Sequence, residues 1–137
     1  MNKINLINVW TNGCFDVIHR GHVEILKHAK SLGDHLTVGI DTDRRVKSLK
    51  GNKRPFHCLE DRVSVLSSIK YVDKVVIFDS DEELENLIKE CSPKFFVKGD
   101  EYKGGKIIGI EYAENLSLFS MVEGHSTTGI LNKYNEK

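Results

Sequence analysis

The chain has 137 residues, and its 20 lysines and arginines balance its 20 aspartates and glutamates, so its formal net charge at neutral pH is zero. This length suits one domain with a buried core and is short for two, so we expect a single domain over residues 1–137. Without net charge there is no global field to attract nucleic acid or an anionic membrane, and any anion site must be local. The sequence shows no signal-peptide segment and no apolar run of membrane length, which favours a cytoplasmic protein with no membrane partner.

Stretches with the composition of strands alternate with stretches of helical apolar spacing. Strands are expected at residues 6–10, 35–40, 74–78, 95–97 and 116–121, and helices at residues 23–32, 59–69, 81–89 and 129–134. Strands separated by helices indicate a parallel sheet covered on both faces, with right-handed crossovers. The predicted fold class is therefore α/β, with three α/β/α layers and a parallel sheet of about five strands.

Two histidines three residues apart, His19 and His22, stand at the turn from the first predicted strand to the first helix. Free backbone N–H groups and the helix dipole favour an anion there, and imidazoles add donors that can become cationic near neutral pH. Such a pair also occurs by chance. Here Gly13 and Gly21 flank the turn and allow close backbone approach, and Asp16 can cap or brace the loop. The pattern lacks the spacing and the third ligand of a zinc site, so it favours phosphate over a protein-held metal.

Cys14, Cys58 and Cys91 are odd in number and far apart, which fits neither a disulfide framework nor a metal knuckle. We expect reduced thiols. A thiol near a helix N-terminus can have a lowered pKa, which makes a reactive Cys14 one interpretation. Packing beside Phe15 is the other interpretation, and the one we favour.

Residues 44–54 hold six cations and form the basic cluster of an otherwise neutral chain. Most charge runs are solvated loops. This run follows the second predicted strand, at the same sheet edge as the histidine turn. We therefore expect a loop that acts as a mobile clamp over a polyphosphate.

Polar clusters follow the carboxyl ends of four predicted strands. They are the histidine turn, the basic residues 44–54, residues 98–103, and the turn at residues 126–128. In open parallel sheets, ligands bind outside the carboxyl ends of the strands. The sequence thus predicts one binding site at this edge.

Gly13-Cys14-Phe15-Asp16 followed by His19-Arg20-Gly21-His22, and the late Ser126-Thr127-Thr128, resemble the cytidylyltransferase-like nucleotidyltransferases. Those enzymes carry a G-x-F-D-x-x-H-x-G-H signature and a late S-T-T turn on a compact Rossmann-like fold. Within the family, the chain is most similar to the heptose 1-phosphate adenylyltransferase type (ADP-heptose synthase), and next to glycerol-3-phosphate cytidylyltransferase. It departs from the cytidylyltransferase at Val122, where that enzyme has an arginine. It departs from the heptose type at residues 99–102, which read Gly-Asp-Glu-Tyr.

The resemblance implies that an acceptor phosphate attacks the α-phosphorus of a nucleoside triphosphate and that pyrophosphate leaves. Adenylyl transfer to a heptose 1-phosphate is the expected reaction. CTP-dependent transfer to glycerol 3-phosphate or a similar phosphate is the alternative, and a nucleotide-binding regulatory module is the non-enzyme alternative. The resemblance also implies Mg²⁺ accompanying the triphosphate, and a homodimer.

The same resemblance implies the residues of the site. The catalytic set is His19, His22, Lys47 and Lys50. The nucleotide-binding set is Cys14, Phe15, Asp16, Gly21, Arg62, Asp100, Ser126, Thr127 and Thr128. No residue is assigned as a metal ligand.

Overall fold

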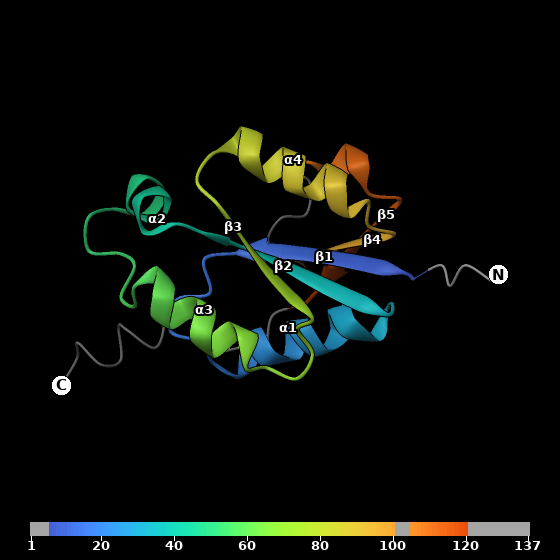
Figure 1. Ribbon diagram of the computed structural model, residues 1–137, viewed down its shortest axis with the longest axis horizontal. Coiled ribbons are helices and arrows are strands. Elements are labelled where there is room, and N and C mark those ends of the chain that lie inside the picture. Colours follow the sequence, from blue (N-terminus) through green and yellow to red (C-terminus); the bar gives the residue numbers. More distant parts are fainter. Residues whose placement is uncertain (1–5, 101–104, 121–137) are drawn as a thin grey trace.

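A five-stranded parallel sheet forms the centre of the molecule in the computed structural model, which describes residues 6–100 and 105–120 (Figure 1). The strands run in the order β3-β2-β1-β4-β5, and every neighbouring pair is parallel. They are β1 (Asn8–Gly13), β2 (His35–Asp41), β3 (Lys74–Phe78), β4 (Phe95–Gly99) and β5 (Asn115–Phe119). The predicted α/β class, with a parallel Rossmann-like sheet, is confirmed.

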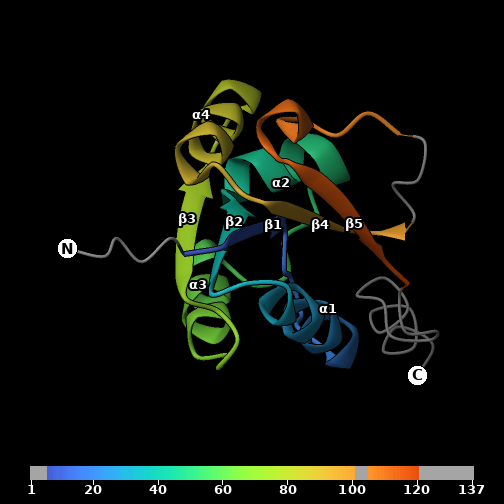
Figure 2. The same ribbon diagram turned by 90° about the vertical axis from the view of Figure 1, so that its right-hand side faces the viewer.

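In the described part of the chain, four α-helices lie around the sheet, two of them on one face. They are α1 (Arg20–Ser31), α2 (Asp43–Lys50), α3 (Leu59–Ser67) and α4 (Asp81–Cys91), and a 3-10 turn, η2 (Ile110–Tyr112), precedes β5. Figure 2 shows α1 and α3 on one side of the sheet and α4 on the other. Helix α2 lies beyond the carboxyl end of β2 (Figure 1). None of the helices in the described ranges is both long and apolar enough to cross a bilayer.

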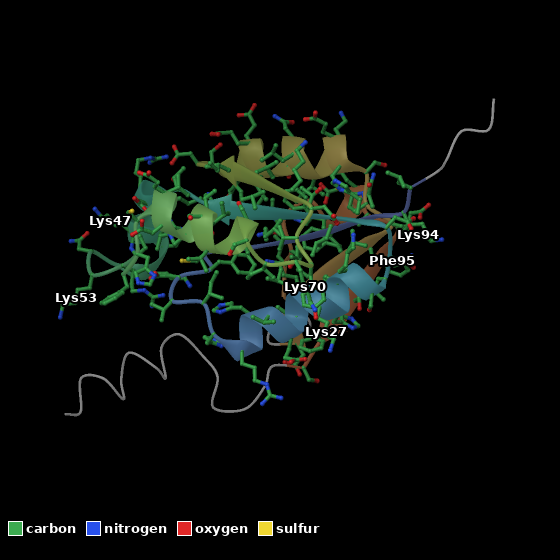
Figure 3. The ribbon with its side chains drawn as sticks, turned by 60° about the horizontal axis from the view of Figure 1, so that its bottom comes forward. Lys27, Lys47, Lys53, Lys70, Lys94 and Phe95 are labelled. Carbon is green, nitrogen blue, oxygen red and sulfur yellow. The ribbon has the colours of Figure 1, made fainter. Side chains whose placement is uncertain are left out.

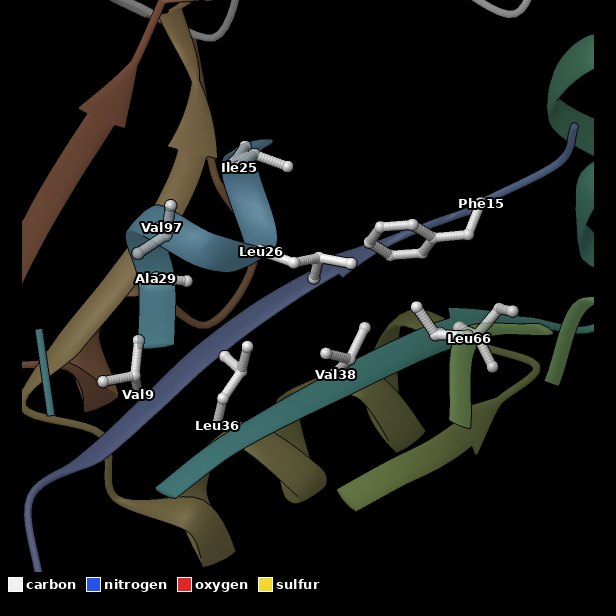
Figure 4. Close-up of a cluster of buried hydrophobic side chains, with 10 residues drawn as sticks. Val9, Phe15, Ile25, Leu26, Ala29, Leu36, Val38, Leu66 and Val97 are labelled. Atoms are coloured by element: carbon white, nitrogen blue, oxygen red, sulfur yellow. The ribbon is translucent and has the colours of Figure 1, made fainter. Parts of the chain in front are cut away.

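Alternate residues along the strands fill two separate cores. On the α1 side, strand residues such as Val9, Leu36 and Val38 pack against Leu26 of α1 (Figure 4). The aromatic ring of Phe15, which follows β1, enters the same cluster. On the α4 side, the core consists of Trp10, Phe78, Leu84, Ile88, Phe96 and Ile107. The loop after β1 is thus anchored in the core by its own aromatic side chain.

One predicted element is wrong. Residues 44–54 were expected to be a loop, but their first part belongs to α2. This helix buries only Val46, so it carries no apolar periodicity that could reveal it. It is stabilised by its cap, since Thr42 Oγ1 accepts a hydrogen bond from the Arg45 N–H at 3.2 Å. Arg45 also pairs with Asp41 and with Asp81, which lie on other elements.

The remaining boundaries differ by a few residues. Helix α1 begins at Arg20, three residues before the predicted start, because His19 caps it. Strand β4 extends to Gly99, and β5 covers residues 115–119. The predicted helix at residues 129–134 lies outside the described residues.

Candidate functional site

The loop between β1 and α1, residues 14–19, carries the histidine turn and has an unusual backbone. Phe15 and Val17 have positive φ values of 49° and 54°. This left-handed region is costly for a β-branched residue such as Val17. Strain of this kind persists only where the surroundings impose it, and it concentrates at functional sites. We refer to residues 14–19 as the histidine loop.

The two histidines form a reciprocal cap at the start of α1. His19 Nδ1 accepts a hydrogen bond from the Gly21 N–H at 3.0 Å, and His22 Nδ1 accepts one from the His19 N–H at 3.1 Å. Their ring centroids are 4.1 Å apart. Accepting at Nδ1 requires a lone pair there, so each neutral ring carries its proton on Nε2. Each ring therefore carries a donor proton on Nε2, which is buried in His19, and an N–H of this kind suits a phosphate oxygen.

His22 is neutral at physiological pH in this arrangement. Burial, followed by the charges of His19 and Lys50, lowers the pKa of His22 from 6.5 to about 4. The expectation that both rings can become cationic near neutral pH is therefore wrong for His22 without a bound anion. Neutrality suits the cap, because protonation at Nδ1 would remove the acceptor that holds the His19 N–H.

The depressed pKa of His22 predicts a pH-dependent stability. The unfolded chain binds a proton near pH 6.5 and the folded chain only near pH 4, so stability rises with pH in this window and is fully present above it. The contribution lost on acidification is roughly 3 kcal/mol. His22→Gln keeps a capping acceptor and does not titrate. Urea unfolding at a series of pH values should show a shallower slope for this variant between pH 4 and 6.5, and parallel curves for the two proteins would refute the assignment.

A pocket opens at the carboxyl ends of β1, β2 and β4. Its lining residues include Asn12, Gly13, Cys14, Asp41, Leu49, Phe78 and Ile107, and the cations Arg45, Lys50, Lys98 and Lys106. Cys14, the first residue of the histidine loop, lines this pocket together with Lys50, so the pocket reaches the histidine loop. His19 and His22 are not among its lining residues.

Lys98 is a residue of this site that the sequence did not single out for a role. Its side chain is only 8% exposed. Its ammonium donates to the Asn12 carbonyl at 3.3 Å and lies 6.0 Å from the ring centroid of Phe96. Buried cations are rare, and this one lies near the carboxyl end of β4, between β1 and β5 in the sheet. Its signal in the sequence is a lysine that directly follows the apolar run Phe95-Phe96-Val97.

Lys47, the other predicted catalytic lysine, projects from α2 into solvent. Figure 3 shows Lys47 and Lys53 at the same end of the molecule, away from Lys70 and Lys94. Lys47 does not line the pocket described above. The structure therefore places Lys50 in the pocket wall and Lys47 outside it, at the same sheet edge.

Arg62 is buried and holds backbone groups rather than facing the pocket. It is 1% exposed, and its Nη1 donates to the carbonyls of Cys14 and Asp41, each at 2.9 Å. Its Nε donates to the His57 carbonyl at 3.0 Å, and its Nη2 donates to Asp43 Oδ1 at 2.6 Å. These contacts make Arg62 a structural partner of the site and leave its predicted contact with nucleotide unsupported.

Asp16 braces the histidine loop, as one interpretation of the sequence held. Its carboxylate accepts the N–H groups of Phe56 at 2.6 Å and His57 at 2.8 Å, and Arg54 Nε at 3.1 Å. Burial alone would raise the pKa of Asp16, but these hydrogen bonds hold it below its ordinary value. Asp16 is therefore ionised whenever the protein is folded near neutral pH.

The other predicted residues divide into two groups. Cys14 is buried, and burial raises the pKa of its thiol, which supports packing over reactivity. All three cysteines are free, as expected. Gly21 lies in the first turn of α1, and Asp100 is exposed directly after β4. Ser126, Thr127 and Thr128 lie outside the described residues.

Comparison with known proteins shows the family of the chain. The cytidylyltransferase-like family model matches residues 10–124. The chain is 50% identical over 125 residues to the bifunctional protein HldE of Campylobacter fetus and 45% identical to that of Helicobacter pylori, covering 91% of this chain in both cases. It spans about a quarter of the length of these curated relatives, with 27% covered in each.

Solved structures show the same fold. A lipopolysaccharide core biosynthesis protein from Thermoplasma volcanium has a TM-score of 0.69 and 25% identity, with 87% of this chain and all of that chain covered. Pantothenate synthetase from Thermus thermophilus has a TM-score of 0.60 at 12% identity, with 86% of this chain and 56% of that chain covered. The chain belongs to the cytidylyltransferase-like family of nucleotidyltransferases.

Proposed function

We propose that this protein transfers the adenylyl group of ATP to a heptose 1-phosphate and releases pyrophosphate. The observation that carries the proposal is the pair of Nε2–H donors of His19 and His22 near a pocket that is lined by four cations, of which Lys98 is buried. The similarity to the HldE proteins supports the choice of this member of the family. Because those relatives are much longer than this chain, their full activity is not transferred to it.

The reaction needs positioning and charge stabilisation more than acid-base chemistry. The attacking phosphate oxygen is already an anion, so it forms the new bond to the α-phosphorus while the bond to the pyrophosphate oxygen breaks. The protein must hold two mutually repelling phosphates in line and stabilise the charge on their oxygens. The imidazole N–H donors of the histidine pair and the Lys50 ammonium, which lines the adjoining pocket, provide these contacts.

The pocket favours an acceptor that carries a phosphate on an otherwise uncharged body. Lys98 and Lys106 supply positive charge on one side, and Leu49 and Ile107 supply apolar contact. Arg45 is occupied by Asp41 and Asp81. We assign Lys98 to the acceptor phosphate, because its ammonium is held in place before any substrate arrives.

We propose that Mg²⁺ enters with the triphosphate. Mg²⁺ commonly uses substrate phosphates and only one or two protein carboxylates. Within the described ranges there is no group of three histidines, cysteines or carboxylates that could hold a metal. Asp16 is engaged by three internal donors, which fits a metal carried by the nucleotide better than one held by this carboxylate.

The alternative reaction is CTP-dependent transfer to glycerol 3-phosphate or a similar phosphate, and the Gly99-Asp100 pair is the feature that favours it. A regulatory module that binds nucleotide without turnover is the alternative outside enzymes. The test is pyrophosphate release from each of the four triphosphates with a panel of sugar and polyol phosphates. We expect release with ATP and a heptose 1-phosphate. Release with CTP and glycerol 3-phosphate selects the alternative, and saturable binding without release selects the module.

Two lysines on the same strand segment provide a matched pair for the acceptor contact. Lys98→Met should raise the KM for the acceptor by about tenfold to a hundredfold, the effect of losing a charged hydrogen bond. Lys94→Met, just before β4 at the opposite end of the strand, should leave it unchanged. Equal kinetics in both variants would remove Lys98 from the site.

A homodimer and a cytoplasmic location are further proposals that rest on the family resemblance. Sedimentation equilibrium of the purified chain tests the first, and a single species at the monomer mass would contradict it. Cell fractionation tests the second.

A further inference from the structure

The basic residues 44–54, here called the basic segment, are connected to the histidine loop by hydrogen bonds at both ends. We call each of these two sets of hydrogen bonds a fastening. At the beginning of the segment, Arg62 joins Asp43 to the Cys14 carbonyl of the histidine loop. At its end, the Asp16 carboxylate of the same loop accepts hydrogen bonds from Arg54 and from the backbone N–H groups of Phe56 and His57, which follow Pro55. Lys47 and Lys50 lie between these two fastenings.

The two fastenings are joined through the backbone of His57. The His57 N–H donates to Asp16, and the His57 carbonyl accepts from Arg62. One peptide segment therefore links the carboxylate to the guanidinium, and both side chains are almost fully buried. Charge-assisted hydrogen bonds in a buried setting are among the strongest in proteins. The connection is accordingly a rigid one.

The histidine loop has a strained backbone, and its contacts with neighbouring residues hold it in that conformation. Phe15 and Val17, on either side of Asp16, both have positive φ. A strained residue of this kind persists only where the surroundings over-determine it. The core contacts of the Phe15 ring and the three donors on Asp16 supply that constraint.

We propose that Asp16 and Arg62 are positioning residues, which hold the backbone that carries Lys50 in place beside the histidine loop before substrate binds. Neither acts as a ligand of the nucleotide or of Mg²⁺. This inference rests on the proposed nucleotidyl transfer and replaces the mobile clamp with a preorganised one. Lysine side chains are flexible, so charge stabilisation of the transition state depends on the backbone that carries them.

The experiment compares two carboxylates of similar type. Asp16→Asn keeps the size of the side chain and removes its charge and one carboxylate oxygen. Asp73→Asn is the control, because Asp73 likewise accepts a backbone N–H, from Leu36, and a cation, Lys30, but lies at the opposite edge of the sheet. Three quantities are measured in both variants: kcat, the Mg²⁺ concentration for half-maximal activity, and amide hydrogen exchange at Phe56 and His57.

For Asp16→Asn we expect kcat to fall by about tenfold to a hundredfold, the effect of a small misplacement of catalytic groups. The half-maximal Mg²⁺ concentration should not change. Exchange at Phe56 and His57 should accelerate by about tenfold, which corresponds to one lost hydrogen bond. Asp73→Asn should change none of the three. If Asp16→Asn does not fold, Arg54→Gln loosens the same fastening from the other side.

Three results would overturn the inference. Recovery of full kcat at high Mg²⁺ would make Asp16 a metal ligand. Accelerated exchange with an unchanged kcat would show that the fastening is not needed for transfer. Unchanged exchange would show that Asp16 does not hold these amides. Amide exchange needs no substrate, so failure of the fastening is distinguished from failure of the proposed activity.

Discussion

Replacement of His19 or His22 by alanine lowers kcat by about a hundredfold to a thousandfold, in our expectation, because each variant removes one preorganised donor to the charge that develops in the transition state. Each ring also caps α1, so its loss costs about 1 kcal/mol of stability as well. The two effects must be separated. We propose to measure kcat at a temperature where circular dichroism shows both variants fully folded.

His28→Ala is the matched control for this experiment. His28 lies on the same helix, but it contacts Ser117 and Phe119 of β5 rather than the site. Its replacement should leave kcat within about twofold of the wild type, because no group in contact with phosphate changes. Near-normal turnover in the His19 and His22 variants would refute the role assigned to the pair.

Arg62→Met is expected to lower the free energy of unfolding by about 3–5 kcal/mol, the range found when one member of a buried charged network is removed. The variant leaves three carbonyl groups without their donor, at Cys14, Asp41 and His57. It also removes the partner of Asp43. Urea unfolding measured by fluorescence at constant pH gives the difference directly.

Arg44→Met provides the comparison for Arg62. Arg44 also pairs with an aspartate, Asp79, but its side chain is 71% exposed. Exposed ion pairs contribute little to stability, so this variant should unfold at nearly the same urea concentration as the wild type. A similar loss of stability in the two variants would contradict the role of Arg62 as a buried structural partner. A normal stability for Arg62→Met together with weaker triphosphate binding would restore its predicted contact with nucleotide.

The main elements of the fold could be predicted from the sequence because each depends on local pattern. The buried strands are short apolar runs, and α1 and α4 carry regular apolar spacing. Helix α2 was missed for the same reason, since one buried residue, Val46, leaves no pattern to recognise. The Thr42 cap and the contacts of Arg45 with Asp41 and Asp81 stabilise it instead.

The roles of site residues could likewise be predicted where they depend on neighbouring residues, but not where they depend on distant ones. The histidine pair was recognised because both members lie within four residues of each other at a strand-to-helix turn. Lys98 drew no assignment, because its importance arises from burial against a strand 86 residues away. Asp16 and Arg62 were grouped with the nucleotide ligands, but their partners lie elsewhere in the chain and face inward.

The amino-acid sequence was therefore sufficient for the family, the parallel sheet and the edge at which the site lies, because adjacent residues encode strands, helices and turns. Tertiary structure determined what each charged group does there. The pKa of His22 and the fastening of the basic segment depend on burial and on contacts between distant residues. Burial and long-range contacts exist only once the chain has folded, so no local pattern records them.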